Sequence, residues 1–326
     1  FQISHARIVI LIECSEESGS AHLPHYLKNY GDRIGTPDLV ICLDSGCGNY
    51  DQLWSTTSLR GLVVGTVKVE VLTEGVHSGM AGGIVPGPFM VVRQLFERLE
   101  NAATGEVKPD ALKVKIPEAR IKQAQKTAQV LGGSISGSIP WTEGMRPLSD
   151  NNVELLLNST WRASLSVVGQ SGMPEVATAG NVLLNSLTYK ISLRVPPSLD
   201  TVAAARTVKA LLEKDPPFGA KVTCTLGGSP GWDAPPLVPW LEQATDAASK
   251  EFSGKEACYF GVGGSIPFMH MIGEKWPQAQ FLITGVLGPN SNAHGPNEFL
   301  HVPYAKKLTA CIVRILAAHA EARKNA

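Results

Sequence analysis

The sequence predicts an α/β protein in which one domain is interrupted by an inserted α+β unit. Towards both ends of the 326-residue chain, short apolar segments alternate with polar loops and helices, the rhythm of a sheet flanked by helices. In the middle, longer segments alternate between apolar and polar residues with a period of two, as half-exposed strands do. We therefore expect an outer domain at 1–61 and 232–326, and an insertion at 62–231.

The first part of the outer domain carries two apolar segments and one short helix. Residues 7–13 are almost continuously apolar and predict a buried strand. A polar stretch near 22–30 predicts a helix, and residues 37–43 predict a second strand that ends at Asp44. In a parallel sheet the loops that follow the strands face the ligand crevice, so residues in these loops are candidates for a site.

The insertion combines two alternating strands with amphipathic helices and a glycine-rich middle. Proline at 196 and 197 ends the second of these strands. The elements expected in it are a strand at 63–71, helices at 88–100 and 118–131, a strand at 186–195, a helix at 201–214 and a strand at 220–226. After the insertion we expect a helix at 241–252, a strand at 280–284 and a terminal helix from residue 303.

Composition excludes several classes of function. Lys and Arg together number 29, as do Asp and Glu, so the net charge is zero and neither nucleic acid nor an acidic membrane is indicated. No run of about 18 apolar residues suits a membrane span. The six cysteines form no Cys-x-x-Cys pair, which indicates reduced thiols and a cytoplasmic protein.

Three charged motifs follow the predicted strands of the outer domain. Glu16 and Glu17 come after the strand at 7–13, Asp44 follows the strand at 37–43, and His294 lies in the loop after 280–284. Each alone has an ordinary alternative: a solvated acidic turn, an Asp cap and a surface histidine. Together they supply carboxylate oxygens and an imidazole nitrogen, a normal ligand set for zinc or manganese.

Further candidates lie in the insertion and in a glycine-rich loop. His77 could donate to an oxyanion, and Arg194 has the fork geometry that fits a carboxylate, although structural roles explain either residue equally well. Gly264 and Ser265 belong to a Gly-Gly-Ser-Ile-Pro loop in which backbone can approach a ligand closely, or which is simply a tight turn.

The order of the motifs points to a known family. No serine-hydrolase elbow, dinucleotide fingerprint or P-loop occurs. The chain instead carries, in order, Glu-Glu-Ser-Gly, Leu-Asp-Ser-Gly, His-Ser-Gly, Ser-Leu-Arg-Val-Pro, Gly-Gly-Ser-Ile-Pro and Ala-His-Gly-Pro-Asn-Glu. Over essentially its whole length it resembles the dinuclear metallopeptidases that include carnosinase and cytosolic nonspecific dipeptidase. Its Gly-Trp-Asp-Ala-Pro-Pro stretch and its His294 loop look most like the bacterial branch.

The resemblance implies a zinc-peptidase-like catalytic domain, a mixed sheet flanked by helices, with an inserted α+β lid that also forms a homodimer. The implied reaction is hydrolysis of the amide bond of dipeptides or related small peptides, with two divalent metal ions, Zn²⁺ or Mn²⁺, activating the water. Glu16 would be the general base, and Glu17, Asp44 and His294 would bind metal. His77 would steady the oxyanion in the partner subunit's site. The substrate-binding residues would be Arg194, Gly264 and Ser265.

Two departures keep alternatives open. The family's other ligands, a His and a bridging carboxylate, precede the first matched strand, so we expect this chain to be a C-terminal portion that alone binds at most one metal well. Val262 stands where relatives generally carry an acidic residue, which favours an N-acyl amino-acid deacylase or carboxypeptidase of the same architecture. A non-catalytic, truncated dimeric homologue is the third possibility.

Overall fold

The computed structural model describes residues 3–324 and divides the chain into two units. The first unit contains the chain up to Leu59, the segment Ile116–Leu157 and the chain from Trp232 onward. The second contains Arg60–Lys115 and Asn158–Gly231. The segment 116–157 therefore lies with the first unit, although we expected it inside the insertion at 62–231.

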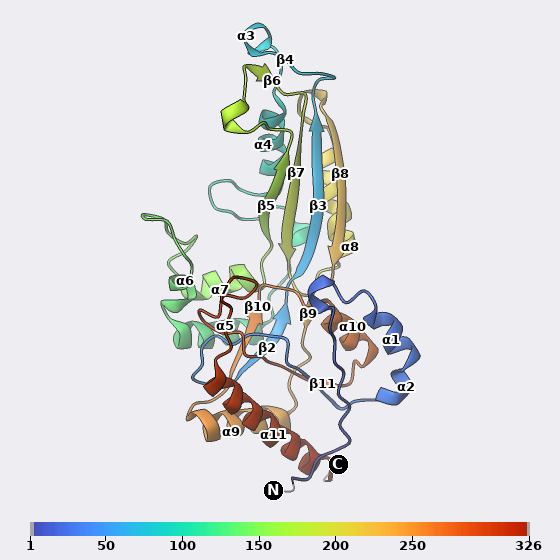
Figure 1. The fold of residues 1–326 in the computed structure, drawn as a ribbon, viewed down its shortest axis with the longest axis vertical. Helices are drawn as coiled ribbons and strands as arrows, with labels where there is room; N and C mark the ends of the chain where they lie inside the picture. Colours follow the sequence, from blue (N-terminus) through green and yellow to red (C-terminus); the bar gives the residue numbers. More distant parts are fainter. Residues whose placement is uncertain (1–2, 325–326) are drawn as a thin grey trace. The chain divides into compact units, whose positions relative to one another are not determined.

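A mixed sheet forms the centre of the first unit (Figure 1). Its strands are, in spatial order, β1 (Leu39–Cys42), β11 (Gln280–Ile283), β2 (Trp54–Leu59) and β10 (Cys258–Val262), and the short β9 (Trp232–Asp233) pairs with β2. β1 is parallel to β11 and β10 is parallel to β2, whereas β11 and β2 are antiparallel. The prediction of a mixed sheet flanked by helices is confirmed.

Helices cover this sheet through two apolar clusters. The helices of the first unit are α1 (Leu23–Asn29), α2 (Gly31–Ile34), α5 (Glu118–Leu131), α6 (Ser134–Gly137), α9 (Pro239–Ser253), α10 (Pro267–Lys275) and α11 (Val302–Lys324), with a 3₁₀ turn at Glu16–Ser18. α7 (Asn152–Thr160) begins in the first unit and ends in the second. One cluster joins Trp54 and Leu282 of the sheet to α9 and α11, and the other joins Leu59 and Phe281 to α1 and α10. Among the described residues no helix is long and apolar enough to span a membrane.

β2 is a strand that the pattern of apolar residues does not reveal. All six of its residues are buried, yet the central four are Ser or Thr. Internal hydrogen bonds make this possible: Thr57 Oγ1 donates to the Phe260 carbonyl (3.1 Å), and Thr56 Oγ1 lies 2.7 Å from Ser45 Oγ. Buried hydroxyls that are paired in this way carry little of the usual desolvation cost.

The buried strand predicted at residues 7–13 is wrong. The segment has no regular structure, and Ile10 and Ile12 are 79% and 80% exposed. A strand needs a hydrogen-bonded neighbour, and none of the strands in the described part of the chain pairs with this segment. Apolar composition alone therefore did not make it a strand.

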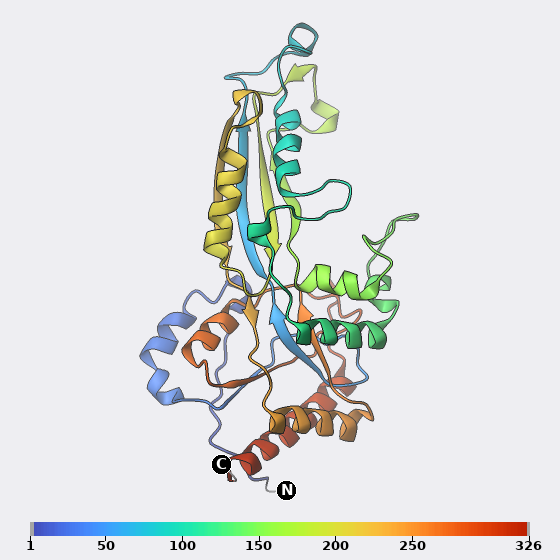
Figure 2. The ribbon, with the colours of Figure 1, turned by 180° about the vertical axis from the view of Figure 1, so that it is seen from behind.

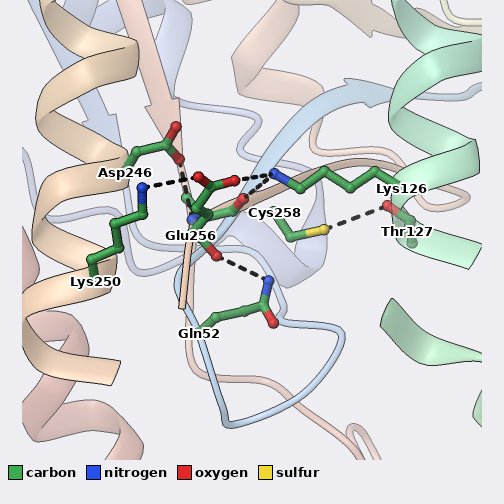
Figure 3. A network of polar contacts seen from close by, with 8 residues as sticks. Gln52, Lys126, Thr127, Asp246, Lys250, Glu256 and Cys258 are labelled. Carbon is green, nitrogen blue, oxygen red and sulfur yellow. Dashed lines mark hydrogen bonds and ion pairs between the residues drawn. The ribbon is translucent and has the colours of Figure 1, made fainter. Parts of the chain in front are cut away.

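A network of polar contacts ties α5 and α9 to the start of β10 (Figure 3). Glu256 forms ion pairs with Lys250 (2.9 Å) and Lys126 (3.4 Å), while Asp246 accepts a hydrogen bond from the Ala257 amide (3.1 Å). Thr127 on α5 also donates to the Tyr259 carbonyl (3.3 Å). These contacts explain why the segment containing α5 lies with the first unit.

The second unit is an antiparallel sheet covered by two helices (Figure 2). Its strands are, in spatial order, β5 (Ser164–Ser171), β7 (Ser186–Val195), β3 (Gly61–Glu70) and β8 (Lys221–Ser229), and β4 (Val76–His77) pairs separately with β6 (Val182–Leu183). The helices are α3 (Ser78–Ala81), α4 (Pro88–Leu99) and α8 (Thr201–Glu213), with 3₁₀ turns at Asp110–Leu112, Val176–Thr178 and Pro217–Gly219. Period-two burial along β7 gives the sheet one face that packs under α4 and α8, and the predicted α+β insertion is confirmed.

Arg98 of α4 caps the end of α8. Its guanidinium donates to the carbonyls of Leu211 (3.1 Å) and Asp215 (2.8 Å), and to that of Lys214. We expect Arg98→Ala to lower the free energy of unfolding by about 1–3 kcal/mol, because it leaves carbonyls at a helix end without their charged donor. Denaturant unfolding measures this, with Arg93→Ala on the exposed side of α4 as the control. Equal losses in both variants would contradict the capping role.

Candidate active site

Glu16 and Glu17 lie on the 3₁₀ turn that follows the apolar segment at residues 7–13. Gly19 ends the turn in a left-handed conformation (φ 92°), and its amide donates to the Glu16 carbonyl (2.7 Å). Before the turn, Glu13 accepts hydrogen bonds from the Ser15 amide and hydroxyl, both at 2.6 Å. Local backbone bonds therefore hold the two adjacent carboxylates without help from a flanking strand.

Asp44 follows β1, in a loop that is joined to the loop after β11. The Cys47 amide donates to the Leu287 carbonyl (2.8 Å), and the Ser45 amide donates to the Thr284 carbonyl (3.2 Å). The two backbones approach so closely that a Cβ on Gly285 would lie 1.6 Å from the Ser45 carbonyl oxygen. Only glycine fits there, so Gly285 lets the loop carrying Asp44 and the loop carrying His294 dock together.

His294 faces Glu17 from the second of these loops. Its Nε2 lies 3.6 Å from Glu17 Oε2, and both side chains are largely exposed. The ring is thus one of the few imidazoles placed directly against a carboxylate in the described part of the chain. Two segments far apart in sequence meet at this pair.

Electrostatic effects link Glu16 and Asp44 to the same group. Partial burial raises the pKa of Glu16, and the negative charges of Asp44 and Glu17 raise it further, while His294 opposes the rise. Burial, followed by the charge of Glu17, also raises the pKa of Asp44. The charges of Glu16, Glu17, Asp44 and His294 therefore act on one another, although no strand precedes Glu16 and Glu17 in the described part of the chain. Like charges held this close favour a bound cation.

The donor set suits a divalent cation but is incomplete. Carboxylate oxygens and an imidazole nitrogen are normal zinc or manganese ligands. The 3.6 Å between His294 Nε2 and Glu17 Oε2 also fits two ligands of one ion, since neighbouring ligands of tetrahedral zinc lie about 3.4 Å apart at ordinary bond lengths. Within residues 3–324, however, no group of three or more His, Cys, Asp or Glu side chains is arranged to hold a metal.

Gly264 and Ser265 lie in the first unit, half-buried between β10 and α10. Val262 ends β10 and packs, partly buried, against the apolar cluster that contains Leu59, Trp232 and Ile272. A Cβ on Gly264 would lie 3.9 Å from the Val262 side chain. The wall beside this loop is therefore apolar at the position of Val262.

His77 and Arg194 belong to the second unit. His77 caps the short helix α3, and its Nδ1 accepts a hydrogen bond from the Gly79 amide (3.0 Å). In the neutral ring this leaves the proton on Nε2, so the exposed side of His77 is a hydrogen-bond donor. Arg194 sits near the end of β7 opposite Leu62 of β3, and burial lowers its pKa.

Arg60 is a charged neighbour of Arg194 that the sequence analysis missed. It is only 8% exposed and donates to Ser164 Oγ (2.9 Å). Burial lowers its pKa to about 10, and the positive charge of Arg194 contributes. The available signal in the sequence was an arginine shortly before the alternating strand predicted at 63–71.

Comparisons with known proteins agree with this architecture. A family model described as peptidase family M20/M25/M40 matches residues 2–318. A cysteinylglycine-S-conjugate dipeptidase from Corynebacterium striatum is 25% identical over 309 residues, covering 91% of this chain and 65% of that protein. A probable di- and tripeptidase from Saccharomyces cerevisiae is 25% identical over 214 residues, covering 64% of this chain and 22% of that protein. The chain thus spans less than two thirds of the length of either relative.

Solved structures show the same fold at low sequence identity. A di-peptidase from Saccharomyces cerevisiae gives a TM-score of 0.73 at 20% identity over 95% of this chain and 65% of that one. Human carnosine dipeptidase 1 gives 0.70 at 20% identity over 94% of this chain and 64% of that one. An M20 family metallo-carboxypeptidase from Sulfolobus solfataricus gives a TM-score of 0.70 at 17% identity, over 93% of this chain and 68% of that one. With the family model matching nearly its whole length, the chain belongs to peptidase family M20/M25/M40.

Proposed function

We propose that this chain forms part of a metal-dependent hydrolase that cleaves the amide bond of dipeptides or related small peptides. The observation that carries the proposal is the gathering of Glu16, Glu17, Asp44 and His294 in a chain of a peptidase family. Two relatives, at 25% identity, are named as peptidases of short peptides. All six cysteines are free thiols, in keeping with a cytoplasmic location.

Each candidate residue has a distinct role in the proposed reaction. Glu17, Asp44 and His294 would hold a divalent cation, Zn²⁺ or Mn²⁺, in a centre that takes two. Such a cation, when bound, acts as a Lewis acid that favours attack of water on a peptide carbonyl. Glu16 accepts the proton from the attacking water and returns it to the leaving amine.

The second unit would supply groups for the substrate. Arg194 would bind the terminal carboxylate of the substrate. Gly264 and Ser265, which belong to the first unit, are proposed as further substrate-binding residues. His77 would donate from Nε2 to the developing oxyanion of the partner's site. The hydrogen bond that His77 Nδ1 accepts from the Gly79 amide favours the tautomer that this role requires. The proposed assembly is accordingly a homodimer formed through the second unit, 60–115 and 158–231.

Hydrolysis of a free dipeptide before and after metal removal tests the proposal. We expect the hydrolase of which this chain forms part to cleave the dipeptide, to lose this activity on exhaustive chelation and to regain it when Zn²⁺ or Mn²⁺ is added back. Metal bound per subunit, measured by elemental analysis, accompanies the assay. Hydrolysis that is unaffected by chelation would contradict a metal-dependent reaction.

Val262 favours a second candidate, an N-acyl amino-acid deacylase or carboxypeptidase of the same architecture. Its apolar side chain has no charge to pair with the free amine of a dipeptide. Comparing kcat/KM for a dipeptide and for its N-acetylated form separates the two candidates. Faster hydrolysis of the acetylated form would favour the deacylase or carboxypeptidase.

A further inference from the structure

The loop that carries His294 has an unusual backbone. Four of its residues other than glycine, Asn290, Asn292, His294 and Asn297, have φ between 58° and 64°. Asparagine and histidine adopt this left-handed region more often than most residues, but it still costs free energy for any residue other than glycine. Such strain persists only where the surrounding structure imposes it. The conformation of His294 therefore needs a cause in its neighbours.

Packing of the His294 ring does not supply that cause. The side chain is 71% exposed, and its ion-pair partner Glu17 is itself 74% exposed. An exposed pair of this kind contributes little to stability. The direction of the imidazole must therefore be set by the backbone of the loop.

Asn292 closes the turn on both sides of His294. Its backbone carbonyl accepts a hydrogen bond from the Gly295 amide (2.9 Å), and its side-chain Nδ2 donates to the Pro296 carbonyl (2.6 Å). A Cβ on Gly295 would lie 2.5 Å from the same Nδ2, so the amide fills the inside of the turn. The two bonds span residues 293–295 and fix the backbone from which the ring projects.

The base of this turn is anchored in the first unit. Ser291 is 3% exposed, its hydroxyl donates to the Gly288 carbonyl (2.7 Å), and its own carbonyl accepts from the Phe299 amide (3.1 Å). Gly288 in turn packs on Tyr50, whose ring stacks on His301 with centroids 4.0 Å apart. Asn292 is therefore held by a rigid base while it holds the strained residue.

We propose that Asn292 is a positioning residue that keeps His294 in its left-handed conformation, facing Glu17. The loop geometry stands by itself, and the consequence for metal binding rests on the proposed function. Loss of the Nδ2 hydrogen bond frees His294 to relax towards a common backbone region, which turns the imidazole away from Glu17.

Asn292→Asp tests this, with Asn297→Asp as the matched control. Both replace a left-handed asparagine of the same loop by aspartate, which tolerates the conformation, adds one negative charge and lacks the amide donor. We expect the Gly295 amide to exchange with solvent about 10-fold faster in Asn292→Asp, since the turn then opens more often, and to be unchanged in the control. Equal exchange in both variants, measured by NMR without metal, would overturn the proposal.

Titration with Zn²⁺ alone gives the second readout. Asn292→Asp should weaken Zn²⁺ affinity by about 10–100-fold relative to Asn297→Asp, as loss of a group that orients a ligand does. Gly295→Ala should act in the same direction, because its Cβ displaces the Asn292 amide. Equal affinities in all variants would overturn the role in metal binding. If the unsubstituted chain binds no Zn²⁺, the proposed function fails, while the exchange result still decides whether Asn292 positions His294.

Discussion

Glu16→Gln should lower kcat for dipeptide hydrolysis by about 10²–10⁴-fold, the range that a positioned general base supplies. The amide matches the carboxylate in shape but cannot accept a proton from water. Glu16 is partly exposed on a turn held by backbone bonds, so the fold should not change. KM should change little, because the proposed role lies in the transition state.

Controls distinguish loss of the base from loss of the site. Glu143→Gln removes an exposed carboxylate of the same unit and should leave kcat unchanged. Zn²⁺ affinity of Glu16→Gln should stay within a few-fold of the parent, since Glu17, Asp44 and His294 are retained. A kcat within a few-fold of the parent would contradict the assignment of Glu16 as the base.

The fold could be predicted wherever a single pattern decided it. Period-two alternation predicted β7 at its observed bounds, and helical spacing predicted α4 to within one residue. The pattern of apolar residues failed to predict strands whose formation depends on contacts with distant parts of the chain. β2 is a Ser/Thr strand in which the hydroxyls of Thr56 and Thr57 are hydrogen-bonded. Residues 7–13 are apolar but have no pairing strand among the described residues. Strand propensity reflects how well side chains pack on the surface of a sheet, and distant parts of the chain form that surface.

The candidate site divides in the same way. Asp44 and His294 lie in loops after β1 and β11, as predicted, whereas Glu16 and Glu17 lie on a 3₁₀ turn that no strand precedes within residues 3–324. Asn292 could not be found from its place in the sequence, because its role depends on a left-handed backbone and on a side chain that closes a turn. Arg60 was missed for a related reason, since its proximity to Arg194 arises from the pairing of β3 and β7.

His77→Ala should lower kcat by about 10²–10³-fold, as removal of an oxyanion donor does, with bound metal unchanged. The Gly79 amide holds Nδ1, so the proton available for donation is on Nε2. His77→Gln keeps an N–H donor on a longer side chain and should retain more activity than alanine. His25→Ala, at another exposed histidine, should have no effect.

A mixture of inactive variants tests whether His77 acts across the proposed dimer. In a heterodimer of His77→Ala and Glu16→Gln subunits, one site combines an intact Glu16 with the intact His77 of the other subunit. The second site then carries both defects. Random pairing during co-expression makes half of the dimers mixed, with one working site in two, so activity should recover to about a quarter of the parent. If His77 instead served its own subunit, no site in the mixture would be intact and activity would stay at the level of the single variants. Recovery therefore requires both a dimer and an exchange of His77 between its subunits.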